Sequence, residues 1–131
     1  MDIPRIFTIS ESAHRIHNPF TPEKYAALGR VLRTKAGTRI LDLGSGSGEM
    51  LCTWARDHGI RGIGVDMSAL FSQQAQQRAE ELGVADSVTF IHQDAAGYVA
   101  EEKCDIAACI GATWIGGGVA GTIALLSKSL K

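Results

Sequence analysis

Residues 40–49, with the sequence ILDLGSGSGE, constrain the fold of this chain more than any other segment. A short apolar run ends at an acid, glycines then occupy alternate positions, and a helical pattern follows at once. This order predicts a strand that stops at a tight turn and leads into a helix. Such a turn brings bare backbone N–H groups against a nucleotide-like ligand. Glycine is needed there because a side chain would block the ligand or forbid the φ angles of the turn.

The spacing of the glycines indicates which kind of loop this is. A dinucleotide-binding fingerprint reads G-x-G-x-x-G, and the position of its third glycine is Glu49 in this chain. Gly44, Gly46 and Gly48, with Asp42 before them, instead give D-x-G-x-G-x-G. This pattern resembles motif I of the class I S-adenosylmethionine (SAM) dependent methyltransferases. A generic strand–helix turn is the alternative interpretation of the glycines taken alone.

A second acid, Asp66, ends the apolar segment RGIGVD. In a βαβ unit the end of the second strand lies beside the first turn, and a carboxylate there can accept hydrogen bonds from both ribose hydroxyls. The alternative role is that of an acid at the start of a helix, with Ser68 as the N-cap. Because the strand end and the helix start are neighbours, Asp66 can fill both roles.

A third acid, Asp94, ends a β-branched and aromatic run that starts at Val88. In the methyltransferase family the matching acid accepts from the adenine amino group, within a G-D-A sequence that reads Gln93-Asp94-Ala95 here. A plain turn residue is the alternative. The resemblance implies a cofactor-binding set at the strand ends, consisting of Asp42, Gly44, Ser45, Gly46, Gly48, Asp66, Met67, Asp94, Ala95 and Ile110.

Strands alternate with helices along the chain, which predicts a Rossmann-like α/β fold with a doubly wound, mostly parallel sheet. Residues 1–35 are expected to form an N-terminal helical cap segment, and residues 36–131 the SAM-binding core. The ligand is expected at the carboxyl ends of the strands, where the winding reverses at strand one. The predicted strands are 39–43, 62–65, the run from 88, and 104–111; the predicted helices are about 21–36, 50–58, 69–82 and 119–130.

The resemblance covers about residues 36–131, and the opening residues MDIPRIF are similar to the uncharacterised enterobacterial methyltransferases of the YjhP type. The family has seven strands, whereas this sequence supplies four and the helix that follows them. The fourth strand is therefore expected on an exposed flank, with apolar side chains such as Ile106 and Ile110. Because an apolar edge strand is a pairing hazard, we expect either a truncated product or a homo-oligomer that completes the sheet.

Composition narrows the class of protein further. A chain of 131 residues suits one small domain, and no apolar run approaches the length of a transmembrane helix or follows a signal-peptide pattern. Three cysteines without C-x-x-C spacing argue against a disulfide scaffold and a zinc site, so a cytoplasmic protein without a metal is expected. Residues 1–39 carry seven Lys or Arg against three Asp or Glu, but no long basic run of the kind that nucleic-acid binders use.

The catalytic residues stay unknown at this level. Methyl transfer from a sulfonium needs mainly orientation and a dry site, although a base helps when the acceptor is a hydroxyl or thiol. Glu11, His14 and His17 are the candidates, and exposed surface residues are the alternative interpretation.

The segment after strand four bears on the acceptor. Amino-directed methyltransferases carry an N/D-P-P-Y/F motif there, whereas residues 111–114 read GATW, so DNA amino methylation is not expected. Trp114 is a candidate for the acceptor pocket or for core packing, and a small-molecule acceptor is predicted. An NAD-type oxidoreductase domain and a fragment that binds SAM without catalysis are the alternatives.

Overall fold

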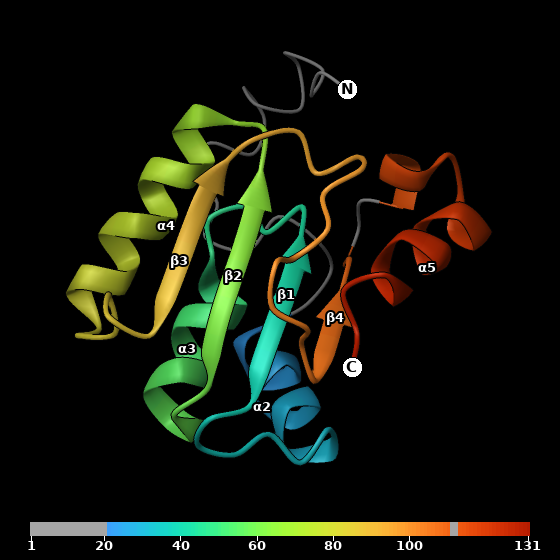
Figure 1. Ribbon diagram of the computed structural model, residues 1–131. Coiled ribbons are helices and arrows are strands. Elements are labelled where there is room, and N and C mark those ends of the chain that lie inside the picture. The colour runs from blue at the N-terminus through green and yellow to red at the C-terminus, as the bar shows by residue number, and fades with distance from the viewer. Residues whose placement is uncertain (1–20, 111–112) are drawn as a thin grey trace.

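The computed structural model describes residues 21–110 and 113–131 (Figure 1). Four parallel strands form one sheet in the order β3-β2-β1-β4, so the winding reverses at β1 and all carboxyl ends meet at one edge. The predicted doubly wound parallel fold is confirmed. The elements are α2 (Pro22–Val31), β1 (Arg39–Leu43), α3 (Glu49–His58), β2 (Arg61–Asp66), α4 (Ala69–Glu81), β3 (Val88–His92), β4 (Ile106–Ala108), the 3-10 helix η1 (Thr113–Gly116) and α5 (Val119–Ser127).

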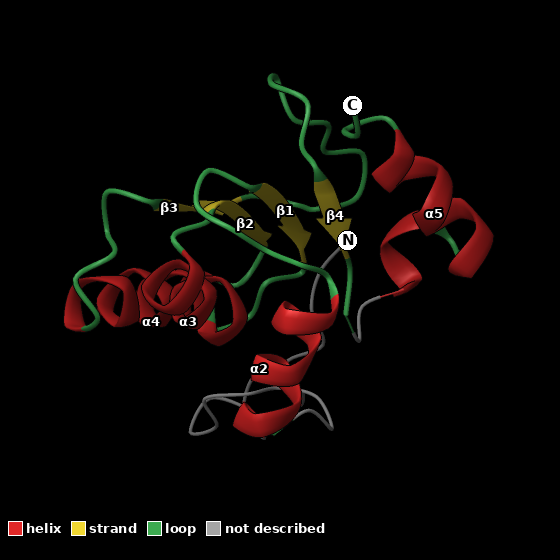
Figure 2. Cartoon of the chain, turned by 90° about the horizontal axis from the view of Figure 1, so that it is seen from below, coloured by secondary structure: helices red, strands yellow, loops and turns green. Residues whose placement is uncertain are grey.

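The two faces of the sheet are covered differently. Helices α2, α3 and α4 lie on one face, whereas α5 lies beyond β4 at the flank of the sheet (Figure 2). Successive strand side chains point to opposite faces, so Ile40 joins the helix-side core and Leu41 joins the other core. The helix-side core includes Trp54, whose Nε1 donates to the Tyr25 carbonyl at 2.9 Å and ties α3 to α2.

The helix starts follow their sequence signals. The Thr21 hydroxyl caps α2 by accepting from the Lys24 amide at 3.2 Å, and the Ser68 hydroxyl caps α4 by accepting from the Phe71 amide at 3.2 Å. Gly59 ends α3 at φ +70°, as predicted.

The expectation that the first helix reaches about residue 36 is wrong, because α2 ends at Val31. The carbonyl of Gly29 accepts from both the amide and the hydroxyl of Thr34, at 3.2 and 2.9 Å. Arg33 between them takes φ +55°, which turns the chain out of the helix. A non-glycine residue at positive φ has no simple sequence signal.

The segment 93–105 connects β3 to β4 without a helix. Its Ala95 and Ala100 are buried against Leu41, Leu43 and Val65 in the second core. The loop 93–105 therefore covers the apolar side chains on this face of the sheet, as α3 and α4 cover those on the other face.

The fourth strand and the last helix are both shorter than predicted. The chain leaves α5 after Ser127 and turns back, so that Leu130 forms an isolated parallel bridge with Cys104, two residues before β4. The Cys104 amide donates to the Ser129 carbonyl at 2.7 Å, and the Lys131 amide donates to the Cys104 carbonyl at 3.1 Å. The chain is therefore paired just before the fourth strand, whereas β4 itself is an edge strand of the sheet, as predicted.

Ile106 and Ile110 were expected to be presented on that flank. Both side chains are instead partly buried and pack against the helix-side core. Alternation along β4 directs Ile106 toward the helix layer rather than outward along the plane of the sheet, and Ile110, beyond β4, packs on the same side.

Candidate functional site

The glycine loop lies at the carboxyl end of β1, as predicted. Gly44, Gly46 and Gly48 have φ angles of +77°, +58° and +77°, a region that side chains rarely adopt. The amides of Gly44 and Ser45 both donate to the Val65 carbonyl, at 2.7 and 3.2 Å. The loop is thereby fixed to the end of β2.

Two further loop amides also have acceptors within the protein. The Gly46 amide donates to Asp66 Oδ2 at 2.9 Å, and the Gly48 amide donates to the Ser45 carbonyl at 3.1 Å. The expectation of bare N–H groups is therefore wrong for these amides, because a turn this tight satisfies its own donors. The glycines supply the backbone angles and a low-profile surface rather than a row of open donors.

Gly48 is required by packing as well as by its backbone angle. A Cβ atom at this position would lie 2.6 Å from Phe90 Cζ and 2.8 Å from Ala75 Cβ. The third glycine thus lets α3 start against β3 and α4. Glu49, the next residue, begins α3 and accepts two hydrogen bonds from the Arg78 guanidinium of α4, at 3.0 and 3.1 Å.

Asp66 ends β2 and is buried, with 6% of its surface exposed. Its Oδ2 accepts from the Gly46 amide, and its Oδ1 accepts from the Ser68 amide at 2.9 Å. The carboxylate therefore joins the glycine loop to the start of α4, which is the role that sequence reasoning gave as the alternative. A carboxylate oxygen has more than one lone pair, so a ligand hydroxyl is a chemically suitable donor to this group.

Asp42 lies in a different environment. It is 5% exposed, and no atom of the described residues bonds to its buried Oδ1. Burial, with a smaller contribution from the charge of Asp66, raises the pKa of Asp42 from 3.8 to about 8. At neutral pH this carboxyl group is therefore mostly protonated, a property that sequence reasoning missed. Its signal was an acid inside a strand, on the face that alternation turns toward the helices.

The remaining predicted residues lie at the same edge. Asp94 follows β3 and accepts from the Ala96 amide at 2.9 Å, as a turn residue would, while Ala95 is buried in the second core. Met67 follows Asp66, and its carbonyl oxygen lies 2.9 Å from His92 Nε2. Ile110 lies two residues beyond β4. Register pairs Asp66 with His92, so His92 belongs to this edge although it was not predicted as a site residue.

Other predicted features lie partly outside the described residues. Glu11, His14, His17 and residues 111–112 are not described, and for Trp114 only the η1 backbone is. Within residues 21–110 and 113–131, no three His, Cys, Asp or Glu side chains gather as a metal site would require. In the same ranges no helix is long and apolar enough to cross a membrane.

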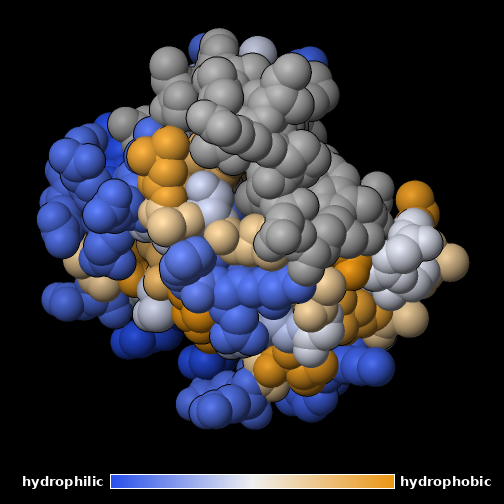
Figure 3. All heavy atoms as spheres, turned by 90° about the horizontal axis from the view of Figure 1, so that it is seen from above, coloured by the Kyte–Doolittle hydropathy of each residue, from blue (hydrophilic) through white to orange (hydrophobic). Residues whose placement is uncertain are grey.

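Viewed from above, onto the carboxyl ends of the strands, the side formed by α4 is mainly hydrophilic and apolar side chains gather toward α5 (Figure 3). On α5, Val119 and Ile123 are 62% and 58% exposed.

Residues 40–128, from the second residue of β1 to one residue past α5, match a family described as a methyltransferase domain. The chain belongs to this methyltransferase-domain family. It is 79% identical over 131 residues to the uncharacterized protein YjhP of Escherichia coli strain K12, and it covers 53% of that protein. The predicted resemblance to the YjhP type is confirmed.

Solved structures of methyltransferases are similar over the whole chain. One is a SAM-dependent methyltransferase from Geobacter sulfurreducens in complex with S-adenosyl-L-homocysteine, with 75% identity and a TM-score of 0.96 over 99% of this chain and 52% of that one. Another is the corresponding complex from Thiobacillus denitrificans, with 73% identity and a TM-score of 0.97 over 100% and 53% of the two chains. The chain thus spans about half the length of these relatives.

Proposed function

We propose that this chain binds SAM at the carboxyl edge of its sheet, as the cofactor-binding part of a SAM-dependent methyltransferase. The observation that carries the proposal is the hydrogen bond between Gly46 and Asp66, which unites the glycine loop with a buried strand-end carboxylate. The S-adenosyl-L-homocysteine complexes of its relatives support this choice of ligand. Family membership and Glu49 at the third fingerprint position favour SAM over the NAD-type alternative.

The residues of the edge fit such a ligand. Carboxylate oxygens accept hydrogen bonds, which suits Asp66 to ribose hydroxyls and Asp94 to an adenine amino group. Asp42 Oδ1, buried and without a partner among the described residues, is an acceptor for the ammonium group of the methionyl part of SAM. Binding of that positive charge would favour the ionised form of this otherwise protonated carboxyl group. We assign Gly44, Ser45, Gly46, Gly48, Met67, Ala95 and Ile110 to the walls of the same site.

Bound SAM supplies a methyl group on a sulfonium, and methyl transfer leaves S-adenosylhomocysteine. The contribution of this chain is to orient the cofactor and exclude water, since in-line displacement requires little else. We propose a small-molecule acceptor, because GATW at 111–114 lacks the amino-methylating motif. A cytoplasmic location is supported by Cys52, Cys104 and Cys109 being thiols.

Calorimetric titration tests the binding site. Asp66→Ala should weaken SAM binding by about 1–3 kcal/mol, because ligand donors lose their acceptor. Asp57→Ala, which removes an exposed carboxylate on α3, should leave the affinity unchanged. Thermal melting of each variant separates lost binding from lost folding, and Asp66→Asn replaces Asp66→Ala if the latter unfolds. Binding of NAD but not SAM, or equal SAM affinity in all variants, would contradict the proposal.

Methyl transfer is a separate question from binding. A tritiated-methyl assay on this chain, beside a full-length relative, distinguishes an active enzyme from a fragment that binds SAM without catalysis. Transfer by the relative alone would favour the fragment.

We also propose self-association through the fourth-strand edge, restricted to the part beyond Cys104, because Ser129 and Lys131 already pair with Cys104. Sedimentation should then detect a dimer that dissociates on dilution. A well-folded monomer at all concentrations would rule this out.

A further inference from the structure

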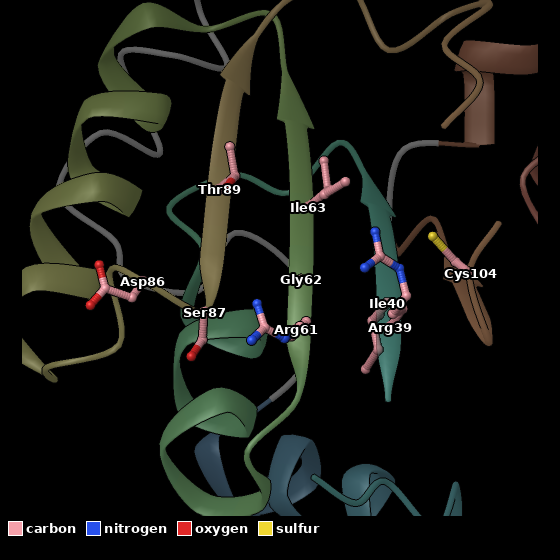
Figure 4. Close-up of a pocket in the computed structure, with 9 residues that line it drawn as sticks. All are labelled: Arg39, Ile40, Arg61, Gly62, Ile63, Asp86, Ser87, Thr89 and Cys104. Atoms are coloured by element: carbon pink, nitrogen blue, oxygen red, sulfur yellow. The ribbon is translucent and has the colours of Figure 1, made fainter. Parts of the chain in front are cut away.

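Two arginines lie side by side on the sheet face that the helices leave open. Arg39 of β1 and Arg61 of β2 are register partners, and both project away from α3 and α4 (Figure 4). Like charges directly opposite each other across a strand pair are destabilising. An arrangement of this kind is stabilised when an anion lies between the two guanidinium groups.

The protein itself satisfies these two groups only in part. Arg39 Nη2 pairs with Glu102 at 3.2 Å, but that carboxylate is 75% exposed. Within the described ranges, nothing accepts a hydrogen bond from the buried Nε of Arg39, and Arg61 forms no ion pair. Donors of both guanidinium groups are therefore available on this face.

The two arginines line a pocket of about 160 Å³. The hydroxyl-bearing Ser87 and Thr89 line it from the side of β3, and the carboxylate of Asp86 lies at that side as well (Figure 4). The volume is well below the roughly 300–1,000 Å³ of pockets that hold drug-sized ligands. The size of the pocket matches a compact ion better than a nucleotide.

We propose that Arg39 and Arg61 form a binding site for a compact oxyanion, of which inorganic phosphate is the representative. Guanidinium groups match the oxygens of such ions in forked pairs, and the hydroxyls of Ser87 and Thr89 add donors. The site lies at the amino ends of the strands. Arg61 is five residues from Asp66 along β2, or roughly 16 Å at the rise of a strand. It shares no residue with the proposed cofactor edge and does not depend on the proposed function.

The two neighbouring carboxylates, Glu102 and Asp86, are expected to weaken oxyanion binding. Glu102 competes with the oxyanion for Arg39, and Asp86 repels it. Glu102→Gln should therefore strengthen phosphate binding about threefold, and Arg61→Gln should weaken it at least tenfold. Arg30→Gln, at an exposed position of α2, removes an equal charge elsewhere and should leave binding unchanged.

The experiment is a phosphate titration of the labelled chain followed by amide NMR shifts, with ionic strength held constant by sodium chloride because salt screens surface charges. Saturable shifts at Arg61, Gly62 and Thr89, and none at Gly46 or Asp66, are the expected result. An unchanged affinity in Arg61→Gln, an equal loss in Arg30→Gln, or unsaturable shifts spread over the surface would overturn the proposal.

Discussion

Asp42 and Asp66 are neighbouring carboxyl groups that differ in their hydrogen bonding. Asp66 accepts two backbone hydrogen bonds, which suit a negative charge, whereas burial leaves Asp42 Oδ1 with no donor among the described residues. Two such groups close together do not both ionise readily. Burial, and to a smaller extent the charge of Asp66, therefore disfavours the ionised form of Asp42.

This asymmetry predicts how stability depends on pH. The pKa of Asp42 is raised from 3.8 to about 8, so the folded chain keeps a proton that the unfolded chain loses. Between about pH 4 and pH 8 this group should lower the free energy of unfolding by up to about 1.4 kcal/mol per pH unit as pH rises. Asp42→Asn, which cannot ionise, should flatten that part of the profile. Urea unfolding at half-unit steps of pH measures the difference.

Glu80→Gln is the control, because Glu80 is exposed on α4. It should reproduce the slope of the unchanged protein. If Asp42→Asn kept the same slope, the proton would have to be bound elsewhere.

At the scale of elements, Gly48 governs how closely α3, α4 and β3 approach. Its positive φ and the 2.6 Å approach of Phe90 to a would-be Cβ are separate constraints. The chain contains a position where only the first applies. Gly83 has φ +70°, and nothing lies within 4 Å of its would-be Cβ.

Gly83→Ala should therefore cost only backbone strain, about 1 kcal/mol. Gly48→Ala should cost about 1–3 kcal/mol more, because the added methyl group must displace Phe90 or Ala75. Chemical denaturation measures both. Phe90→Leu should reduce the excess cost of Gly48→Ala by making room. Equal costs at the two glycines would mean that the packing adjusts freely.

The sequence was sufficient to predict the elements whose boundaries depend on neighbouring residues. Strand ends, the caps Thr21 and Ser68, and the stop at Gly59 follow from side-chain chemistry within a few residues. The end of α2 and the short β4 depend on Thr34 reaching back to Gly29 and on Cys104 pairing with Ser129. Such contacts have no local pattern.

In the candidate site, too, some features could be predicted from the sequence, and others depend on contacts between distant residues. Position along the strands was enough to bring the predicted residues to one sheet edge. The acceptors of the loop amides and the protonation of Asp42 arise from packing between β1, β2 and α4, and the pattern of residues does not encode them.

On the scale of the whole molecule, the two cores are closed by different means. The helix-side core is covered by α2, α3 and α4, whereas the second is closed by segment 93–105, η1 and α5. Ser129 is central to the second closure. Its buried hydroxyl accepts from the Ala100 amide at 2.9 Å, and its carbonyl accepts from Cys104. We expect the second core to unfold locally at a lower free energy than the helix-side core.

Thiol labelling distinguishes the two openings, because Cys52 (0% exposed) reports on α3 and Cys104 (1% exposed) reports on the β4 flank. Ser129→Ala leaves the buried Ala100 amide without its acceptor. Since an unsatisfied buried donor costs about 1–3 kcal/mol, we expect roughly tenfold faster labelling of Cys104 and no change at Cys52. Ser127→Ala is the matched control, because the Ser127 hydroxyl is exposed and donates to the Ile123 carbonyl within α5. Equal acceleration at Cys52 and Cys104 would mean that the two cores unfold as a single cooperative unit.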